Sequence, residues 1–86
     1  MASFELAISA TAERQLRKLG QQDRIRILRG VLRLAQEPYP RGCRKLTGFD
    51  DVYRIRVGIY RVVYSVNRRR IVVVILKVGH RKDVYR

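Results

Sequence analysis

Three arginines are spaced so that one face of a short two-stranded segment could bind phosphate groups. Residues 53–66 read YRIRVGIYRVVYSV, and successive side chains of a strand point to opposite faces. A two-residue Gly-Ile turn at 58–59, with glycine where a positive φ is needed, predicts Arg56 opposite Arg61, with Arg54 on the same face. Like charges paired across two strands destabilise a hairpin, so folding alone does not explain the three guanidinium groups. A polyanion on that face would explain them.

The remaining side chains favour chemistry without a metal. The sequence has one histidine, one cysteine and seven scattered carboxylates, too few to expect a site of three or four ligands, so we expect no metal and no cofactor. No glycine-rich phosphate loop and no recognisable nucleophile motif occurs. Arginine, lysine, histidine and tyrosine suit RNA cleavage in which the ribose 2′-OH attacks the neighbouring phosphate. Cations would stabilise the charged phosphorane, and other groups would move two protons.

The candidate residues come from the hairpin and from the end of the chain. We predict a catalytic role for Arg54, Arg56, Arg61, His80, Arg81 and Tyr85. We predict RNA contacts for Lys45, Arg54, Arg56, Arg61, Arg68, Arg69, Lys82 and Arg86. His80 is the only side chain with a reference pKa near ~6.5, which makes it the ready proton shuttle. Arginine, with a pKa above about 12, is a poor base.

Each candidate also has a structural alternative. The hairpin arginines could form a solvated face or anchor another protein. His80 could be a strand-end residue, and Arg81 could form a salt bridge with Asp83. Tyr85 could stack on a base, move a proton or cover the end of the sheet.

The charge is large and unevenly distributed. Twenty Lys+Arg against seven Asp+Glu give a net charge of +13, and sixteen of the twenty are arginine. Residues 41–86 hold thirteen of the bases but only three of the acids. Arginine forks match phosphate oxygens bidentately and stack on bases. The basic half of the chain therefore favours a nucleic acid or an acidic protein as partner.

The hydrophobic pattern predicts an α+β fold of order β-α-α-β-β-β, with two N-terminal helices on one face of a small antiparallel sheet. Residues 3–8 alternate as a first strand. Ser9 or Thr11 can cap the first helix and Gly20 can end it. Asp23 is a plausible cap for the second helix, which ends before the prolines at 38 and 40.

Apolar spacing also predicts the core. The predicted core positions are Ala12, Leu16, Leu19, Ile25, Leu28, Val31, Leu32, Ala35, Tyr53, Ile55, Val57, Tyr60, Val62 and Tyr64. Gly30 in mid-helix predicts close packing. Residues 71–78 predict a central strand with Val66 opposite Ile71. Its second face would carry an apolar patch beside the arginines, formed by Val72, Val74 and Leu76.

The length predicts a single domain over residues 1–86. The first residues lack a basic segment followed by a long apolar run, so we expect no signal peptide. No stretch approaches the ~20 apolar residues of a membrane span, and the single cysteine fits a reducing compartment. The expected location is the cytoplasm.

Four motifs resemble the RelE branch of the RelE/ParE toxins of bacterial and archaeal toxin–antitoxin systems. They are RKLTG at 44–48, YRIRVG at 53–58, YRVVY at 60–64, and VGHR at 78–81 followed by Val84-Tyr85. The resemblance covers nearly the whole chain. It implies a small toxin that enters the ribosomal A site and cuts mRNA, leaving a cyclic 2′,3′-phosphate and a 5′-hydroxyl. It also implies a RelB-like antitoxin as partner in a hetero-oligomer.

The resemblance assigns roles residue by residue. Arg54 and Arg56 stand where relatives commonly carry lysine, so an amine base is missing there and that task shifts to His80 or Tyr85. Arg61 matches the arginine after the tyrosine. Arg81 and Tyr85 match the arginine and tyrosine of the C-terminal segment. Two other functions remain open: a ParE-like inhibitor of DNA gyrase without catalysis, and a plain RNA- or ribosome-binding protein.

Overall fold

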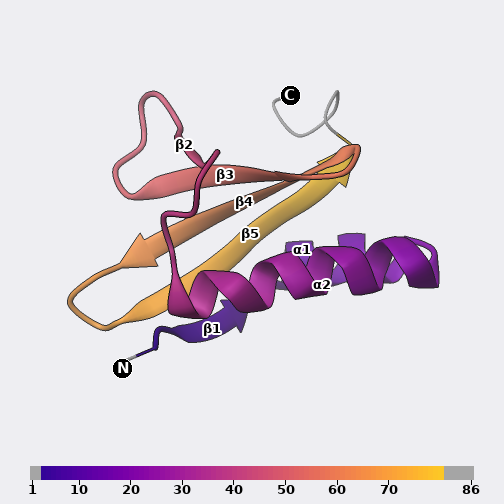
Figure 1. Ribbon diagram of the computed structural model, residues 1–86, viewed down its shortest axis with the longest axis horizontal. Helices are drawn as coiled ribbons and strands as arrows, with labels where there is room; N and C mark the ends of the chain where they lie inside the picture. Colours follow the sequence, from indigo (N-terminus) through magenta and orange to yellow (C-terminus); the bar gives the residue numbers. More distant parts are fainter. Residues whose placement is uncertain (1–2, 81–86) are drawn as a thin grey trace.

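The computed structural model, which describes residues 3–80, has two helices on one side of a five-stranded sheet (Figure 1). The elements are β1 (Glu5–Ile8), α1 (Ala10–Arg17), α2 (Gln21–Gln36), β2 (Arg44–Lys45), β3 (Val52–Val57), β4 (Tyr60–Asn67) and β5 (Val72–His80). The predicted α+β class and its two-helix layer are confirmed, and β2 is an additional short strand.

The sheet is mixed, whereas the sequence analysis expected an antiparallel one. Its strand order is β1-β5-β4-β3-β2, and β1 pairs with β5 in parallel, Glu5 with Val72 through Ile8 with Ile75. The other pairs are antiparallel. Parallel neighbours need a long crossover connection, and here the helices and the β3–β4 hairpin supply it. The last strand therefore returns between the first strand and the hairpin.

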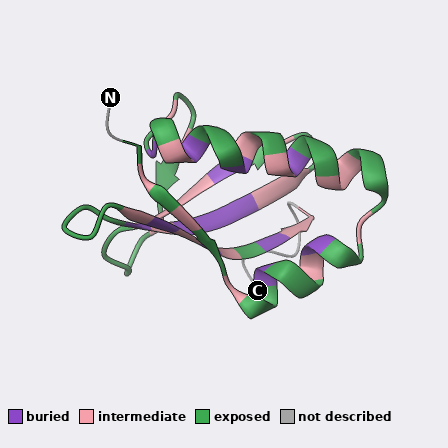
Figure 2. Cartoon of the chain, turned by 90° about the horizontal axis from the view of Figure 1, so that it is seen from below, coloured by how far each residue is buried: buried purple, intermediate pink, exposed green. Residues whose placement is uncertain are grey.

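The core lies between the helices and the strands β4 and β5. Figure 2 shows long buried stretches in the sheet, whereas buried and exposed residues alternate along the helices. Tyr64 is fully buried, and its hydroxyl donates a 2.7 Å hydrogen bond to the Pro38 carbonyl. This bond ties the centre of the sheet to the loop that follows α2. Tyr53 packs on Tyr64 with ring centroids 6.0 Å apart.

Helix α1 docks on β5 through side-chain bonds to the strand's backbone. Ser9 is the N-cap, as predicted: its Oγ accepts from Ala12 N at 3.0 Å and donates to Leu76 O at 2.9 Å. Gln15 Oε1 accepts from Val78 N at 2.6 Å. Strand β1 has ended by this point, so α1 satisfies backbone groups that would otherwise lack partners.

Leu76 is an extra residue in β5. Val63 pairs with Lys77 and Tyr64 with Ile75, which leaves Leu76 without a partner in β4, as in a β-bulge. The alternation of faces therefore changes at this point. Ile75 and Val78 are both buried although three positions separate them.

Helix α2 differs from the sequence prediction in its start and in its buried stripe. It begins at Gln21 after the N-cap Gly20, not near Asp23. The buried residues are Ile27, Val31 and Leu34, whereas Ile25 and Leu32 are 42% and 64% exposed. The helix carries two apolar stripes, so periodicity could not decide which one faces the sheet.

Gly30 fixes how closely α2 approaches the sheet. A Cβ at this position would lie 3.1 Å from Val57 Cγ2, which is tighter than normal packing. The predicted close approach at Gly30 is therefore confirmed, and it sets the distance between α2 and the β3 strand.

The pairing of β4 with β5 is shifted by two residues from the predicted register, around a turn over residues 68–71. Val66 pairs with Val73, not with Ile71, and Ile71 has a φ of +56° in the loop. Asn67 Oδ1 accepts from Arg70 N at 3.0 Å and organises this turn. A shift of two residues preserves side-chain alternation, so the predicted faces of β5 hold as far as the bulge.

No helix in the described range 3–80 is long and apolar enough to cross a membrane.

Candidate nucleic-acid interface

The β3–β4 hairpin brings the three predicted arginines together on the face opposite the helices. Its register is the predicted one: Arg56 pairs with Arg61 and Arg54 with Val63, around a turn in which Gly58 has a φ of +61°. Directly opposed Cβ atoms lie about 5 Å apart and diagonal ones about 7–8 Å. Arg56 is exposed, and Arg54 and Arg61 are half-buried. The three guanidinium groups can therefore contact one phosphodiester.

Gly79 lies next to Arg61 in the sheet. The two residues are paired across β4 and β5, so the position next to the Arg61 side chain on this face carries no side chain at all. The Nε atom of Arg61 is buried, which restricts the motion of its guanidinium. A cation with restricted motion is the kind of group that stabilises charge developing on a bound group.

Two further cations lie on the same face, and the sequence analysis missed both. Arg44 pairs with Arg54 across β2 and β3, and Lys77 pairs with Val63 across β4 and β5. Both side chains are exposed. The row from Arg44 to Lys77 crosses three strand spacings, about 14 Å in all. We call Arg44, Arg54, Arg56, Arg61 and Lys77 the cationic face.

The sequence pattern did not place Lys77 and Arg44 on the cationic face, for a different reason in each case. Unbroken alternation along β5 puts Lys77 on the same side as the buried Ile75, and only the bulge at Leu76 turns it to the cationic face. Arg44 belongs to a two-residue strand that no hydrophobic pattern marks. The predicted RNA contact Lys45 pairs instead with Tyr53, which points to the helix side.

His80 lies on the helix side of the sheet, away from the cationic face. It pairs with Tyr60 across β4 and β5, and the two rings meet edge to face with centroids 6.4 Å apart. The Tyr60 hydroxyl donates to Asp23 Oδ2 at 3.0 Å, and this bond raises the pKa of Tyr60. Asp23, expected to cap α2, instead anchors this aromatic pair. The structure thus does not bring His80 together with Arg61.

Arg68 and Arg69, two of the predicted RNA contacts, do not join the cationic face. Arg68 and Arg69 lie in the turn after β4, and Arg61 is at the other end of that strand, about 20 Å away at ~3.3 Å per residue. The Arg68 guanidinium stands 6.0 Å from the centre of the Tyr39 ring. The remaining predicted residues lie outside the described range: Arg81, Lys82, Tyr85 and Arg86.

An apolar strip borders the cationic face on β5. Val72, Val74 and Leu76 are only half-buried, as the sequence analysis expected. Val63, between Arg54 and Lys77, is 6% exposed and is not part of the main core cluster. A partner covering this face would therefore meet cations and aliphatic side chains next to each other. Within residues 3–80, no three His, Cys, Asp or Glu side chains gather into a metal-binding group.

Comparisons with known proteins agree on one family. Residues 6–85 match the family model of the ParE toxin of type II toxin–antitoxin systems, parDE. Toxin RelG of Mycobacterium tuberculosis is 35% identical over 88 residues, covering 96% of this chain and 97% of the relative.

Solved structures with the same fold include the archaeal RelE–RelB complex from Pyrococcus horikoshii. Its match has a TM-score of 0.83 at 34% identity and covers 95% of this chain and 99% of that one. The isolated E. coli RelE toxin matches with a TM-score of 0.80 at 30% identity, over 96% of this chain and 92% of that one.

Proposed function

Because this chain belongs to the RelE/ParE family of type II toxin–antitoxin toxins, we propose that it is an endoribonuclease that cuts mRNA in the ribosomal A site. The family resemblance predicted from the motifs is confirmed by these comparisons. The observation that carries the nuclease proposal is the cationic face: five basic side chains on one side of four adjacent strands. A phosphodiester is the ligand that this arrangement fits best.

In the proposed reaction the ribose 2′-oxygen attacks the adjacent phosphorus and the O5′–P bond breaks. The 2′-OH proton leaves, and the departing O5′ gains a proton, so the products are a cyclic 2′,3′-phosphate and a 5′-hydroxyl. Arg54, Arg56 and Arg61 would stabilise the extra negative charge of the phosphorane. The chemistry requires no metal or cofactor.

The proton transfers are assigned to the C-terminal segment. Tyr85 and Arg81 are proposed from the family motif to complete the site. His80 is a weaker candidate than predicted from the sequence, because its pairing with Tyr60 places it on the helix side. The ribosome would supply orientation of the message, which can contribute about 7–11 kcal/mol.

A RelB-like antitoxin is the proposed protein partner. The related P. horikoshii RelE was solved in complex with RelB. Here the cationic face and the strip Val72, Val74 and Leu76 adjoin, so we propose that the inhibiting segment is acidic on one side and apolar on the other. The hetero-oligomer would hold the toxin inactive, and action on ribosomes would place it in the cytoplasm.

Primer extension on a translated message after brief expression tests the proposed function. We expect cuts at fixed positions within codons, which disappear when translation of that message is blocked. Double-strand DNA breaks without mRNA cuts would instead assign gyrase as the target, the alternative suggested by the ParE family model. If neither mRNA cuts nor DNA breaks occur, the remaining function is that of an RNA- or ribosome-binding protein.

Lys77 is expected to contribute to cleavage through its charge. Lys77→Ala should slow single-turnover cleavage on programmed ribosomes about tenfold, since one of five cations on the face is lost. Lys77→Arg should keep most of the rate. Lys18 is the exposed C-cap of α1, and Lys18→Ala is the matched control, which should change the rate less than about twofold. An unchanged rate in Lys77→Ala would remove Lys77 from the site.

A further inference from the structure

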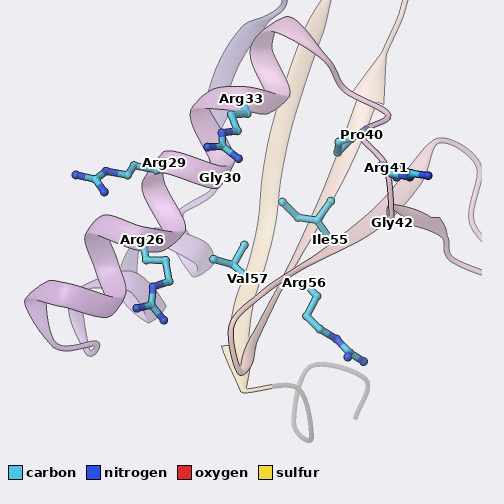
Figure 3. Close-up of a pocket in the computed structure, with 10 residues that line it drawn as sticks. All are labelled: Arg26, Arg29, Gly30, Arg33, Pro40, Arg41, Gly42, Ile55, Arg56 and Val57. Atoms are coloured by element: carbon cyan, nitrogen blue, oxygen red, sulfur yellow. The ribbon is translucent and has the colours of Figure 1, made fainter.

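A second basic surface lies on the helix side, in a groove between α2 and the edge of β3 (Figure 3). The groove encloses about 400 Å³. Its floor is formed by Gly30, Ile55 and Val57, and its basic rims by Arg26, Arg29, Arg33, Arg41 and Arg56. Figure 3 shows Arg29 extending outward from one rim, and Arg41 and Arg56 from the other. We call this the α2–β3 groove.

Folding does not account for the arginines of α2. Arg26, Arg29 and Arg33 follow one another at i, i+3 and i+7, and like charges at these spacings destabilise a helix. All three are exposed, so they fill no core position. No carboxylate occurs among the described residues that line the groove. Such a concentration of unneutralised charge is stable when an anion binds it.

The arrangement of the charged side chains along α2 suits a chain of phosphates. The helix rise of ~1.5 Å per residue places the three α2 arginines about 4.5 and 6 Å apart along the axis, which makes a row rather than a single point. The described lining contains no aromatic ring and no amide or hydroxyl side chain. Arginine is therefore the only described side chain of the lining that could contact a base, and we expect most of the binding energy to come from phosphate contacts, with little dependence on sequence.

Arg56 connects the groove with the cationic face. It lines the groove and also pairs with Arg61 on the opposite side of the sheet's edge. Arg26 reaches the same end of the hairpin, since its Nη1 would be 3.5 Å from a Cβ placed at Gly58. This continuity favours an RNA assembly over an acidic peptide, because an RNA that surrounds the cut strand would meet both surfaces.

We propose that the α2–β3 groove binds the phosphate backbone of a second RNA segment, separate from the message that is cut. This inference rests on the proposed function for its biological setting, in which that segment belongs to the structural RNA of the ribosome. Binding itself is a property of the groove and can be measured without cleavage.

The test uses the full chain and a 2′-O-methyl RNA hairpin, which lacks the attacking hydroxyl. The variant is Arg26→Gln/Arg29→Gln/Arg33→Gln. Its control, Arg14→Gln/Arg17→Gln/Lys18→Gln, removes the same charge from exposed positions of α1 and its C-cap. We expect affinity, measured by fluorescence anisotropy, to fall at least about tenfold in the variant and less than about threefold in the control. The plot of log affinity against log salt has a negative slope, and its magnitude should be smaller by about 2 in the variant.

Two outcomes would overturn the proposal. Equal losses in variant and control would show that only net charge matters. If the variant keeps its affinity for RNA but loses affinity for an acidic polyglutamate peptide, the groove binds a protein partner instead. Thermal melting checks folding, and we expect no loss of stability because the three substitutions remove repulsion.

The two proposals fail separately. If the variant loses RNA affinity but the unaltered chain cuts no message, RNA binding by the groove is supported and the nuclease proposal is wrong. If the chain cuts mRNA while variant and control bind RNA alike, the nuclease stands and the groove fails.

Discussion

Arg61→Gln is expected to slow mRNA cleavage by about 100- to 1,000-fold, the loss typical of removing one preorganised donor to a transition-state charge. Arg61 pairs with Arg56 on one side and with Gly79 on the other, and its buried Nε restricts the motion of its guanidinium. Glutamine keeps some length but has neither the charge nor the fork. The measurement is single-turnover cleavage on ribosomes programmed with a defined codon.

Two controls make this result interpretable. Arg14→Gln removes one charge from an exposed position on α1 and should leave the rate within about twofold. Arg61→Lys keeps the charge without the bidentate geometry and should recover part of the rate. If Arg61→Gln cuts at the unaltered rate while melting normally, the cationic face is not the catalytic surface.

Tyr64→Ala is expected to destabilise the protein by about 3–5 kcal/mol, because a large buried ring is removed and the cavity can collapse only partly. Tyr64 is fully buried in β4 and contacts the Tyr53 ring. Domains of this size are stable by roughly 5–15 kcal/mol, so the variant should unfold at much lower urea. Equilibrium urea unfolding followed by circular dichroism measures the difference.

Tyr64→Phe separates the hydroxyl from the ring. It keeps the packing and loses only the bond to the Pro38 carbonyl, at a cost of about 1–3 kcal/mol. Burial, with smaller contributions from Cys43, raises the pKa of Tyr64 far above its ordinary value. Unfolded tyrosine ionises near pH ~10, so above that pH the unfolded chain releases a proton that the folded chain retains.

The stability contributed by this raised pKa is complete below pH ~10 and is lost as pH rises further. Between pH 8 and about pH 11, the free energy of unfolding should therefore fall less steeply with pH for Tyr64→Phe than for the unaltered chain. Equal slopes would contradict a buried, protonated Tyr64. The raised pKa values of Tyr39 and Tyr60 remain in both proteins and cancel in the comparison.

The sequence alone predicted the parts of the site that depend on neighbours in the chain. A two-residue turn at Gly58 determines which residues of β3 and β4 face each other, so the positions of Arg54, Arg56 and Arg61 followed directly. The cap at Ser9 was equally local. Both depend on side-chain period or backbone geometry within a few residues, whereas the mid-helix Gly30 predicted a close approach without its partner, Val57.

The tertiary structure decided what depends on distant contacts. The bulge at Leu76, held by Ser9 and Gln15 of α1, turned Lys77 to the cationic face. After that bulge, His80 lies on the helix side, where its ring meets that of Tyr60. The local pattern did not show this, because the groups that bind the backbone at the bulge come from a segment more than 60 residues away in the sequence.

The rotation of α2 and the direction of β1 were decided in the same way. Two apolar stripes on α2 were equally consistent with its sequence, and packing of Gly30 on Val57 selected one of them. That choice left Arg26, Arg29 and Arg33 along the α2–β3 groove. Side-chain period is a property of the chain, whereas the partner that each face meets is a property of the folded molecule.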